Sequence, residues 1–286
     1  MLKYDDFKDQ LLNDFKNTTE IDKTLSKRIR KKLRSTKVSD AINEMIDEKN
    51  FSSSRIVGLF ASTLGAFFDC YINRKHTLLA MNSYLLNIAF PEINNITIFE
   101  RNIPIIKSYI FILDRFFFYQ QKHYKHFDIF PLEFIDKDDY SKIQNLNEYK
   151  NFLEIFKSQH IYTLMKLDEE LTGHTTLQHI SGVHAIALHV AKQLYELGIP
   201  VDIGLISGAA ATHDIGKYGC IGENSKRVPY LHYYFTDQWT KKNNLNYIGH
   251  IATNHSVWDL ELENLPAESL VLIYADFRVK NKQLPK

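Results

Sequence analysis

The stretch that decides the fold runs from Leu205 to Lys217 and reads LISGAAATHDIGK. Positions 208 to 211 hold one glycine and three alanines, small residues that let neighbouring helices approach closely. We therefore expect a buried helix at the middle of a domain. This helix delivers His213 and Asp214, and polar groups at the end of a buried helix need a partner, because an unpaired buried charge is costly. A divalent metal ion is a good candidate, since it accepts both a nitrogen and an oxygen ligand.

Histidines accumulate around this doublet, and eight of the twelve in the chain follow Leu171. A His–Asp doublet alone also fits a hydrogen-bonded core histidine, so its neighbours decide between the two interpretations. On a helix starting near Thr176, His179 heads a stripe of apolar residues, at 183, 186, 187 and 190, that would face the core. His184 and His189 lie off the centre of this stripe, and we expect them to be surface or packing residues.

Together these positions resemble the HD-domain metal-dependent phosphohydrolases, over roughly residues 167 to 280. That family has a His, then His-Asp, then a late Asp on helices, and a binuclear subgroup has two further histidines before the late Asp. The matching residues, in order, are His179, His213, Asp214, His232, His255 and Asp276. The resemblance implies that these six residues bind two divalent transition-metal ions and that Asp214 bridges them. A ligand set of nitrogen and oxygen favours iron, manganese, cobalt or nickel over zinc or magnesium.

The resemblance also implies an enzyme, a hydrolase that cleaves a phosphoester or phosphoanhydride of a nucleotide-like small molecule by a metal-bridged hydroxide. Asp214 and Lys217 are the expected catalytic residues, and Lys217 would also contact a phosphate oxygen as a point charge. Arg227 and His250 are further candidates for substrate binding. His250 and His255 are five residues apart and do not share a helix face, so we expect only His255 to be a metal ligand.

Departures from the family pattern narrow the expected substrate. The segment after Asp259 reads LELE and lacks the Gly-Tyr-Pro of the cyclic-di-GMP hydrolases. Thr175 stands four residues before His179, where a glutamate would indicate a third metal. The pattern is nearest to that of the diadenosine polyphosphate hydrolases. The alternative function is a non-catalytic HD module, regulatory or scaffolding, that binds a nucleotide or a protein partner; the complete ligand set favours the enzyme.

Composition sets limits on location and partners. The formal net charge of +1 gives no overall field that would attract nucleic acid or an anionic membrane, so we expect a small phosphorylated substrate, no membrane association and no nucleic acid. Cys70 and Cys220 make no disulfide framework, which fits a reducing compartment. The N-terminus lacks the apolar segment of a signal peptide, and the apolar stretch 56–68 is too short to span a bilayer. A cytoplasmic location is therefore expected.

Apolar residues at helical spacing, and the lack of Asn-Gly or Asp-Gly hairpin turns, predict an all-α chain. Helices are expected at 4–16, 27–34, 55–74, 77–90, 104–117, 148–171, from 176, through 205–214, and at 232–239, with Ser39 capping another.

A polar passage at 124–149 predicts two domains: a helical domain of unknown role at 1–140, and an HD-type helical bundle at 141–286. Because the chain ends soon after Asp276, we expect the bundle to be truncated at its C-terminus, within a longer parent chain. The basic run from Lys27 to Arg34 could touch phosphate or an acidic partner, although a solvated helix face is the simpler interpretation.

Overall fold

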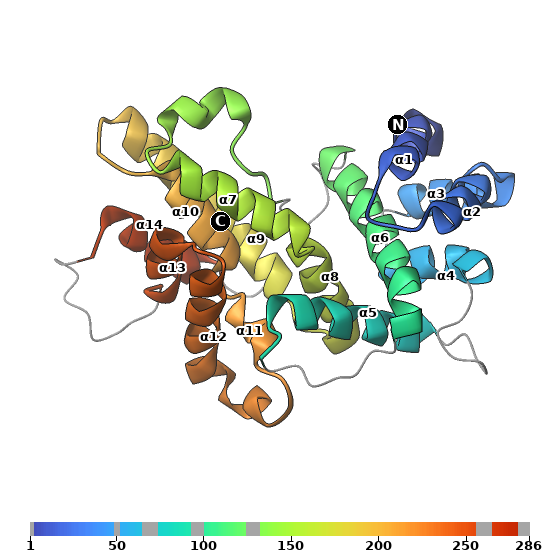
Figure 1. The fold of residues 1–286 in the computed structure, drawn as a ribbon. Helices are drawn as coiled ribbons and strands as arrows, with labels where there is room; N and C mark the ends of the chain where they lie inside the picture. Colours follow the sequence, from blue (N-terminus) through green and yellow to red (C-terminus); the bar gives the residue numbers. More distant parts are fainter. Residues whose placement is uncertain are drawn as a thin grey trace. The chain divides into compact units, whose positions relative to one another are not determined.

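A computed structural model describes residues 3–48, 52–64, 74–92, 100–123, 132–255 and 265–279. Over these residues the chain is all-α, as predicted, with fourteen α-helices, three short 3-10 helices and no β-strand (Figure 1). None of the described helices is long and apolar enough to cross a membrane. The chain divides into two compact units, one of Met1–Phe127 with His160–Gly173 and the other of Asp128–Gln159 with His174–Lys286.

The first unit is built from amphipathic helices. Its helices are α1 (Tyr4–Asn17), α2 (Lys23–Leu33), α3 (Thr36–Asp47), α4 (Ser53–Leu64), α5 (Arg74–Ala89), η1 (Glu100–Asn102), α6 (Ile103–His123) and α8 (Ile161–Thr172). In α3 the buried face starts at Val38 and continues through Ile42 and Met45, so the helix begins one turn earlier than expected. Ser35, and not Ser39, occupies the N-cap position. The helix expected at 55–74 is observed to Leu64, and residues 65–73 lie outside the described residues.

The prediction of a single helix at 148–171 is wrong. The structure has α7 (Leu146–Ser158) followed by α8, with a break at His160, whose backbone is left-handed at φ 54°. α7 belongs to the second unit, whereas α8 returns to the first and packs against α5 there. The chain therefore changes unit at residues 127/128, 159/160 and 173/174, where the sequence predicted one boundary at 140/141. A fragment starting at residue 128 would keep α8 without the helix that covers it.

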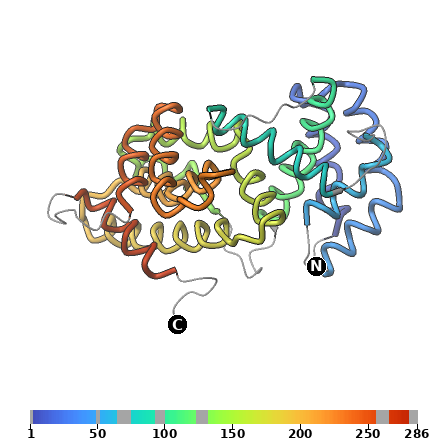
Figure 2. The backbone as a smooth tube through the Cα atoms, turned by 90° about the horizontal axis from the view of Figure 1, so that it is seen from below, coloured from blue at the N-terminus to red at the C-terminus, as the bar shows by residue number. Residues whose placement is uncertain are grey.

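The second unit surrounds α10. Besides α7 it contains η2 (Lys137–Lys142), α9 (Thr176–Glu196), α10 (Ile203–Thr212), α11 (Gly216–Gly219), η3 (Gly222–Arg227), α12 (Val228–Lys242), α13 (Asn246–Thr253) and α14 (Ala267–Arg278). All ten residues of α10 are buried, and this helix contacts α7, α9, α13 and α14. Figure 2 shows α14, in red, beside the long α9. The predicted central helix is thus confirmed.

The small residues of α10 allow this packing. A Cβ atom on Gly208 would lie 2.5 Å from Cδ1 of Ile248, a residue of α13, and one on Gly204 would lie 2.5 Å from Cγ2 of Ile143. Asp202 caps the start of the helix, where its side chain accepts hydrogen bonds from the backbone of Gly204 and Leu205. The cap fixes one end of α10, and the expected metal-binding doublet follows the other end.

Candidate metal centre

The doublet lies where α10 ends. Thr212 is the last helical residue, His213 and Asp214 form a turn, and α11 begins at Gly216. The backbone N–H of Lys217 donates to the carbonyl of Asp214 at 3.0 Å, a three-residue bond that tightens the chain. On a continuous helix the two adjacent side chains would point about 100° apart. The turn lets both of them contribute to one site.

Gly216 allows α12 to close on the doublet. A Cβ atom there would lie 1.9 Å from the carbonyl oxygen of His232 and 2.6 Å from the backbone nitrogen of Thr236, so no side chain fits. The buried Thr236 links the two segments, since its hydroxyl donates to the carbonyl of His213 at 3.2 Å and accepts from the N–H of Gly216 at 3.1 Å. These contacts place His232 beside the doublet.

Four histidines surround the carboxylate of Asp214. Its Oδ2 lies 3.6 Å from Nε2 of His179 and 3.5 Å from Nε2 of His213. Its Oδ1 lies 3.8 Å from Nε2 of His232 and 3.9 Å from Nε2 of His255. The two oxygens of one carboxylate therefore face two different pairs of histidines, which come from four separate segments of the chain.

Asp276 on α14 lies beside His179 and His213, the two histidines that face Oδ2 of Asp214. Its Oδ1 lies 2.8 Å from Nε2 of His179 and 3.7 Å from Nε2 of His213. Burial alone would raise the pKa of Asp276, but the hydrogen bond from His179 lowers it below its usual value. Two sets of three ligand atoms, each within 4.8 Å of one another, result: His179, His213 and Asp276, and His213, Asp214 and His255.

Backbone hydrogen bonds fix the orientation of three of the rings. In each, Nδ1 lies within hydrogen-bonding distance of a carbonyl oxygen in the preceding turn, and a carbonyl can only accept. The distances are 2.9 Å for His213 and Ala210, 2.7 Å for His232 and Val228, and 2.6 Å for His255 and Ala252. A neutral ring with a proton on Nδ1 carries its lone pair on Nε2, the atom that faces Asp214. This arrangement is typical of metal-binding histidines, whose second nitrogen donates to the protein.

The buried environment favours the protonation states that ligands need. Burial lowers the pKa of His213 to about 4 and also lowers the pKa of His232, so both rings are neutral near pH 7. Burial would raise the pKa of Asp214, but its interactions with His213 and Lys217 outweigh burial and keep that pKa well below its usual range. The centre therefore offers neutral nitrogens and an ionised carboxylate.

Lys217 lies at the edge of this cluster. Its Nζ is 2.5 Å from Oδ2 of Asp214, and 34% of its side chain remains exposed. The ammonium group thus partly balances the buried carboxylate and can also be reached from solvent. The contact of Lys217 with a substrate stays a prediction.

Tyr233 also belongs to the site and was missed in the sequence. The centroid of its ring is 3.8 Å from that of His232 and 5.0 Å from that of His255. Burial raises the pKa of its phenol to about 12, so the hydroxyl stays protonated at neutral pH. The sequence could have indicated Tyr233, because it directly follows His232, an expected metal ligand. Thr236 had a similar signal, since it follows His232 by four residues and shares its helix face.

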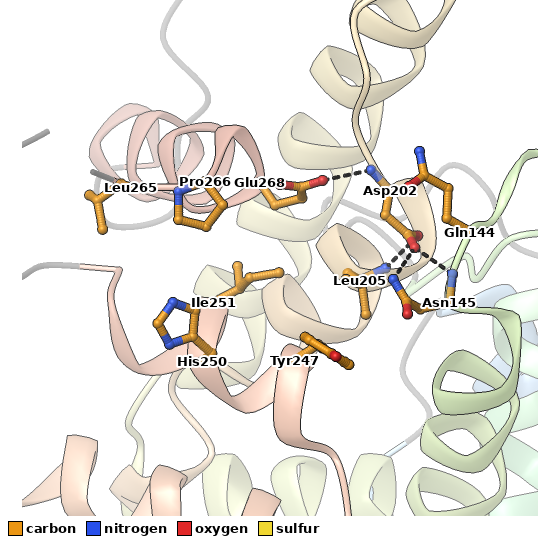
Figure 3. A pocket seen from close by; sticks show the side chains of 10 residues that line it. All are labelled: Gln144, Asn145, Asp202, Leu205, Tyr247, His250, Ile251, Leu265, Pro266 and Glu268. Carbon is orange, nitrogen blue, oxygen red and sulfur yellow. Dashed lines mark hydrogen bonds between the residues drawn. The ribbon is translucent and has the colours of Figure 1, made fainter. Parts of the chain in front are cut away.

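Two further residues that are expected to bind substrate, Arg227 and His250, are both exposed. Arg227 is exposed at the end of η3. His250 is exposed on α13, where it lines a separate cavity of about 540 Å³ (Figure 3). The lining of this cavity consists of Gln144, Asn145, Asp202, Leu205, Tyr247, His250, Ile251, Leu265, Pro266 and Glu268.

The cavity lies at the other end of α10 and α14 from the cluster. Eleven residues separate Asp202 from His213, and eight separate Glu268 from Asp276, which corresponds to about 12–17 Å along a helix. His250 lines this cavity five residues before His255, and its contact with a substrate stays a prediction.

His184 is a packing residue, one of the two alternatives expected for it. It is buried, and its Nε2 lies 3.0 Å from the hydroxyl of Ser207 on α10. Burial lowers its pKa to about 3. His189, in contrast, is exposed as expected. His184 is thus a hydrogen-bonded core histidine in the same unit as the ligand cluster.

Comparisons with known proteins give no further guide to this site. No family model matches the chain, and neither a curated protein nor a solved structure matches it. The function must therefore be inferred from the residues and their geometry.

Proposed function

We propose that the chain is a metal-dependent phosphohydrolase of the HD-domain type, with two divalent metal ions held by its second unit. Its substrate would be a phosphoester or phosphoanhydride of a nucleotide-like small molecule. The observation that carries the proposal is the environment of Asp214, whose two carboxylate oxygens face two different pairs of histidine Nε2 atoms.

The chemistry of these atoms supports a bound cation. The Nε2 atoms of His213, His232 and His255 carry lone pairs when these rings are neutral, and a carboxylate also only accepts hydrogen bonds. Their separations from Asp214, 3.5 to 3.9 Å, are longer than hydrogen bonds. Several acceptors facing one another in a buried place repel unless a positive charge lies among them. A metal ion beside each oxygen of Asp214 would bind both the carboxylate oxygens and the histidine nitrogens that face them.

The residues divide between two ions. His179, His213 and Asp276 would hold one, His232 and His255 the other, and Asp214 would be shared, since a carboxylate has two oxygens to offer. Ions at such a pair of sites supply a hydroxide nucleophile at neutral pH and stabilise negative charge on the phosphoryl oxygens. The set has no sulfur ligand, which favours iron, manganese, cobalt or nickel.

The side chains of the chain supply the remaining functions. Lys217, with its partly exposed ammonium group, would bind a non-bridging phosphate oxygen and so stabilise the charge that develops during transfer. The ring of Tyr233 packs on His232 and His255 and restricts how these two can turn. Tyr230 is 82% exposed, three residues before Tyr233 on α12, and could stack on a nucleobase.

The test is an activity panel on the full chain loaded with Mn²⁺, Fe²⁺ or Co²⁺ in turn. The panel covers dinucleoside polyphosphates, nucleoside mono- and triphosphates, cyclic dinucleotides and single-stranded nucleic acid. We expect turnover of a small nucleotide that depends on the metal. Turnover of the nucleic acid alone would contradict the proposal. Binding of two metal ions without any turnover would instead support a regulatory or scaffolding module.

A further inference from the structure

The most strongly charged stretch of the chain lies in the first unit, away from the ligand cluster in sequence. Residues 23 to 37 contain eight lysines and arginines and no aspartate or glutamate. They are Lys23, Lys27, Arg28, Arg30, Lys31, Lys32, Arg34 and Lys37. Most of them belong to α2, in blue in Figure 1, and the last lies in the first turn of α3.

The buried side of α2 orients these charges. Ser26, Ile29 and Leu33 are buried against the rest of the unit. Lys27, Arg28 and Lys31 are exposed on the opposite side, which we call the basic face. At about 100° per residue, Lys27 and Arg28 diverge by that angle and Lys31 lies between them. The basic face is therefore a band of positive charge directed at solvent.

The stability of the helix does not account for this pattern. Cations in the last turn of a helix interact favourably with its dipole, but Lys23 lies in the first turn, where the dipole disfavours it, and Lys27 lies outside both terminal turns. Like charges four residues apart on a helix repel each other and destabilise it. α2 and its C-cap contain four such pairs: Lys23–Lys27, Lys27–Lys31, Arg28–Lys32 and Arg30–Arg34.

In the part of the chain that the structure describes, no carboxylate forms an ion pair with these cations. Among the described residues, no ion pair joins any of the eight cations to an aspartate or glutamate. Elsewhere in the same unit Arg55 pairs with Glu44, and Arg115 pairs with Asp14. The positive charge of α2 is therefore available to an external anion.

The two units also differ in net charge. The first unit has 21 lysines and arginines against 17 aspartates and glutamates, and the second has 14 against 17. The overall charge of +1, from which we expected no nucleic acid, thus combines a basic unit with an acidic one. An anionic partner would be attracted to the first unit.

The shape and composition of the basic face distinguish among anionic partners. A helix that inserts into a membrane surface needs its apolar side free, whereas Ile29 and Leu33 of α2 are buried in the unit. Binding of single strands relies on exposed aromatic side chains that stack on bases, and residues 23–37 contain none. A duplex presents paired bases inside and regularly spaced phosphates outside, so cations without aromatics suit it.

We propose that the basic face of α2 binds the phosphate backbone of a duplex nucleic acid, without preference for sequence. Lys27, Arg28 and Lys31 make the central contacts, and Lys23 and Arg34 extend them along the helix. This surface is independent of the metal centre and of the reaction proposed for it.

The test compares two charge-matched triple variants of the full chain. Lys27→Gln, Arg28→Gln and Lys31→Gln together alter the basic face, and Lys137→Gln, Lys150→Gln and Lys157→Gln together remove the same charge from exposed positions of the second unit. Glutamine is a good helix former, and circular dichroism of both variants checks the fold. The probe is a fluorescent DNA duplex of about 20 base pairs, titrated between about 50 and 200 mM salt.

We expect the wild-type chain and the second-unit variant to bind alike. The α2 variant should bind at least about tenfold more weakly, and the slope of log affinity against log salt should shrink by about 3, roughly 0.9 per lost phosphate contact. Three results would overturn the proposal: no binding of the duplex by the wild-type chain, equal weakening in both variants, or tighter binding of anionic lipid vesicles or of a single strand than of the duplex.

Discussion

Each unit of this chain contains a contact between histidine and aspartate, part-buried in the first unit, and the two contacts use the aspartate differently. In the first unit, Asp114 on α6 has a separate donor for each oxygen. The hydroxyl of Thr163 donates to Oδ1, and Nδ1 of His160 contacts Oδ2. Every oxygen is satisfied by the protein, so this contact is a structural pair that also holds the left-handed residue at the start of α8.

In the second unit, Asp214 faces four histidine nitrogens, and at least three of them carry lone pairs when the rings are neutral. Lys217 is the one side chain among the described residues that donates a short hydrogen bond to it, at 2.5 Å. A His–Asp contact is therefore not by itself a sign of a metal site. The informative feature is an excess of buried acceptors over donors, which a bound cation would balance.

The two units should differ most in metal binding when Asp214 and Asp114 are each replaced by alanine. Asp214→Ala or His213→Ala should lower metal affinity by more than about 100-fold, the upper range for loss of groups that merely support ligands, and should abolish phosphohydrolase activity. Asp114→Ala should leave the metal content unchanged, because its oxygens face donors. Metal analysis after dialysis measures both. Full metal content in Asp214→Ala would show that the cluster is a second structural network.

Lys217 tests whether the donor to Asp214 is part of the ligand set or of the substrate site. Lys217→Ala should retain the metal and lower kcat by about 10²–10³-fold, as is typical for removing one group that stabilises transition-state charge. Lys241→Ala, at an exposed position of the same unit, is the control and should change neither quantity. If Lys217→Ala lost the metal ions, its role would be to hold the cluster together.

Two buried threonines provide a matched pair of smaller changes. Thr236→Val removes the hydroxyl that links His213 to Gly216, and Thr163→Val removes a donor to Asp114. Each should lower the free energy of unfolding by about 1–3 kcal/mol, because a buried group loses its partner. Only Thr236→Val should also weaken metal binding, by about tenfold. Equal metal affinity in the two variants would argue that Thr236 has no positioning role.

The smallest expected effect is a difference between His160 and His184 in how each makes the free energy of unfolding depend on pH. Burial would lower the pKa of His160, but its hydrogen bond to Asp114 raises it above the usual value. A raised pKa in the folded state gives stability that is present below the unfolded value of about 6.5 and is lost as pH rises through the folded pKa. For His184, whose pKa is lowered to about 3, stability is present above about 6.5 and falls as pH drops towards 3.

Urea unfolding at a series of pH values separates these contributions. Asp114→Asn should remove part of the loss of stability on the alkaline side, and His184→Gln should remove part of the loss on the acid side. The two variants serve as controls for each other. Identical pH profiles for both variants and the wild type would show that neither histidine is linked to folding.

The sequence was most informative where one physical constraint dominated. The run of small residues before His213 predicted the central buried helix, and the six ligand candidates in order predicted side chains that now converge on one place. That they bind metal remains a prediction.

The features that were missed depend on contacts between distant segments. The break at His160 was not predicted, because a left-handed backbone at a histidine needs the support of Asp114 from another helix. The hydrogen-bond partner of His184 was not predicted, because Ser207 lies across the helix interface on α10. The charge difference between the units was understated because the predicted boundary placed residues 128–140, with five acidic residues and one lysine, in the first domain.

The metal stoichiometry of the purified full chain tests the central claim most directly. We predict about two transition-metal ions per chain, as expected for a pair of ions that share one carboxylate. A His232→Ala, His255→Ala double variant should lower this number to about one, because the remaining set of His179, His213 and Asp276 still holds an ion. A single ion in the wild-type chain that is unaffected by the double variant would contradict the account.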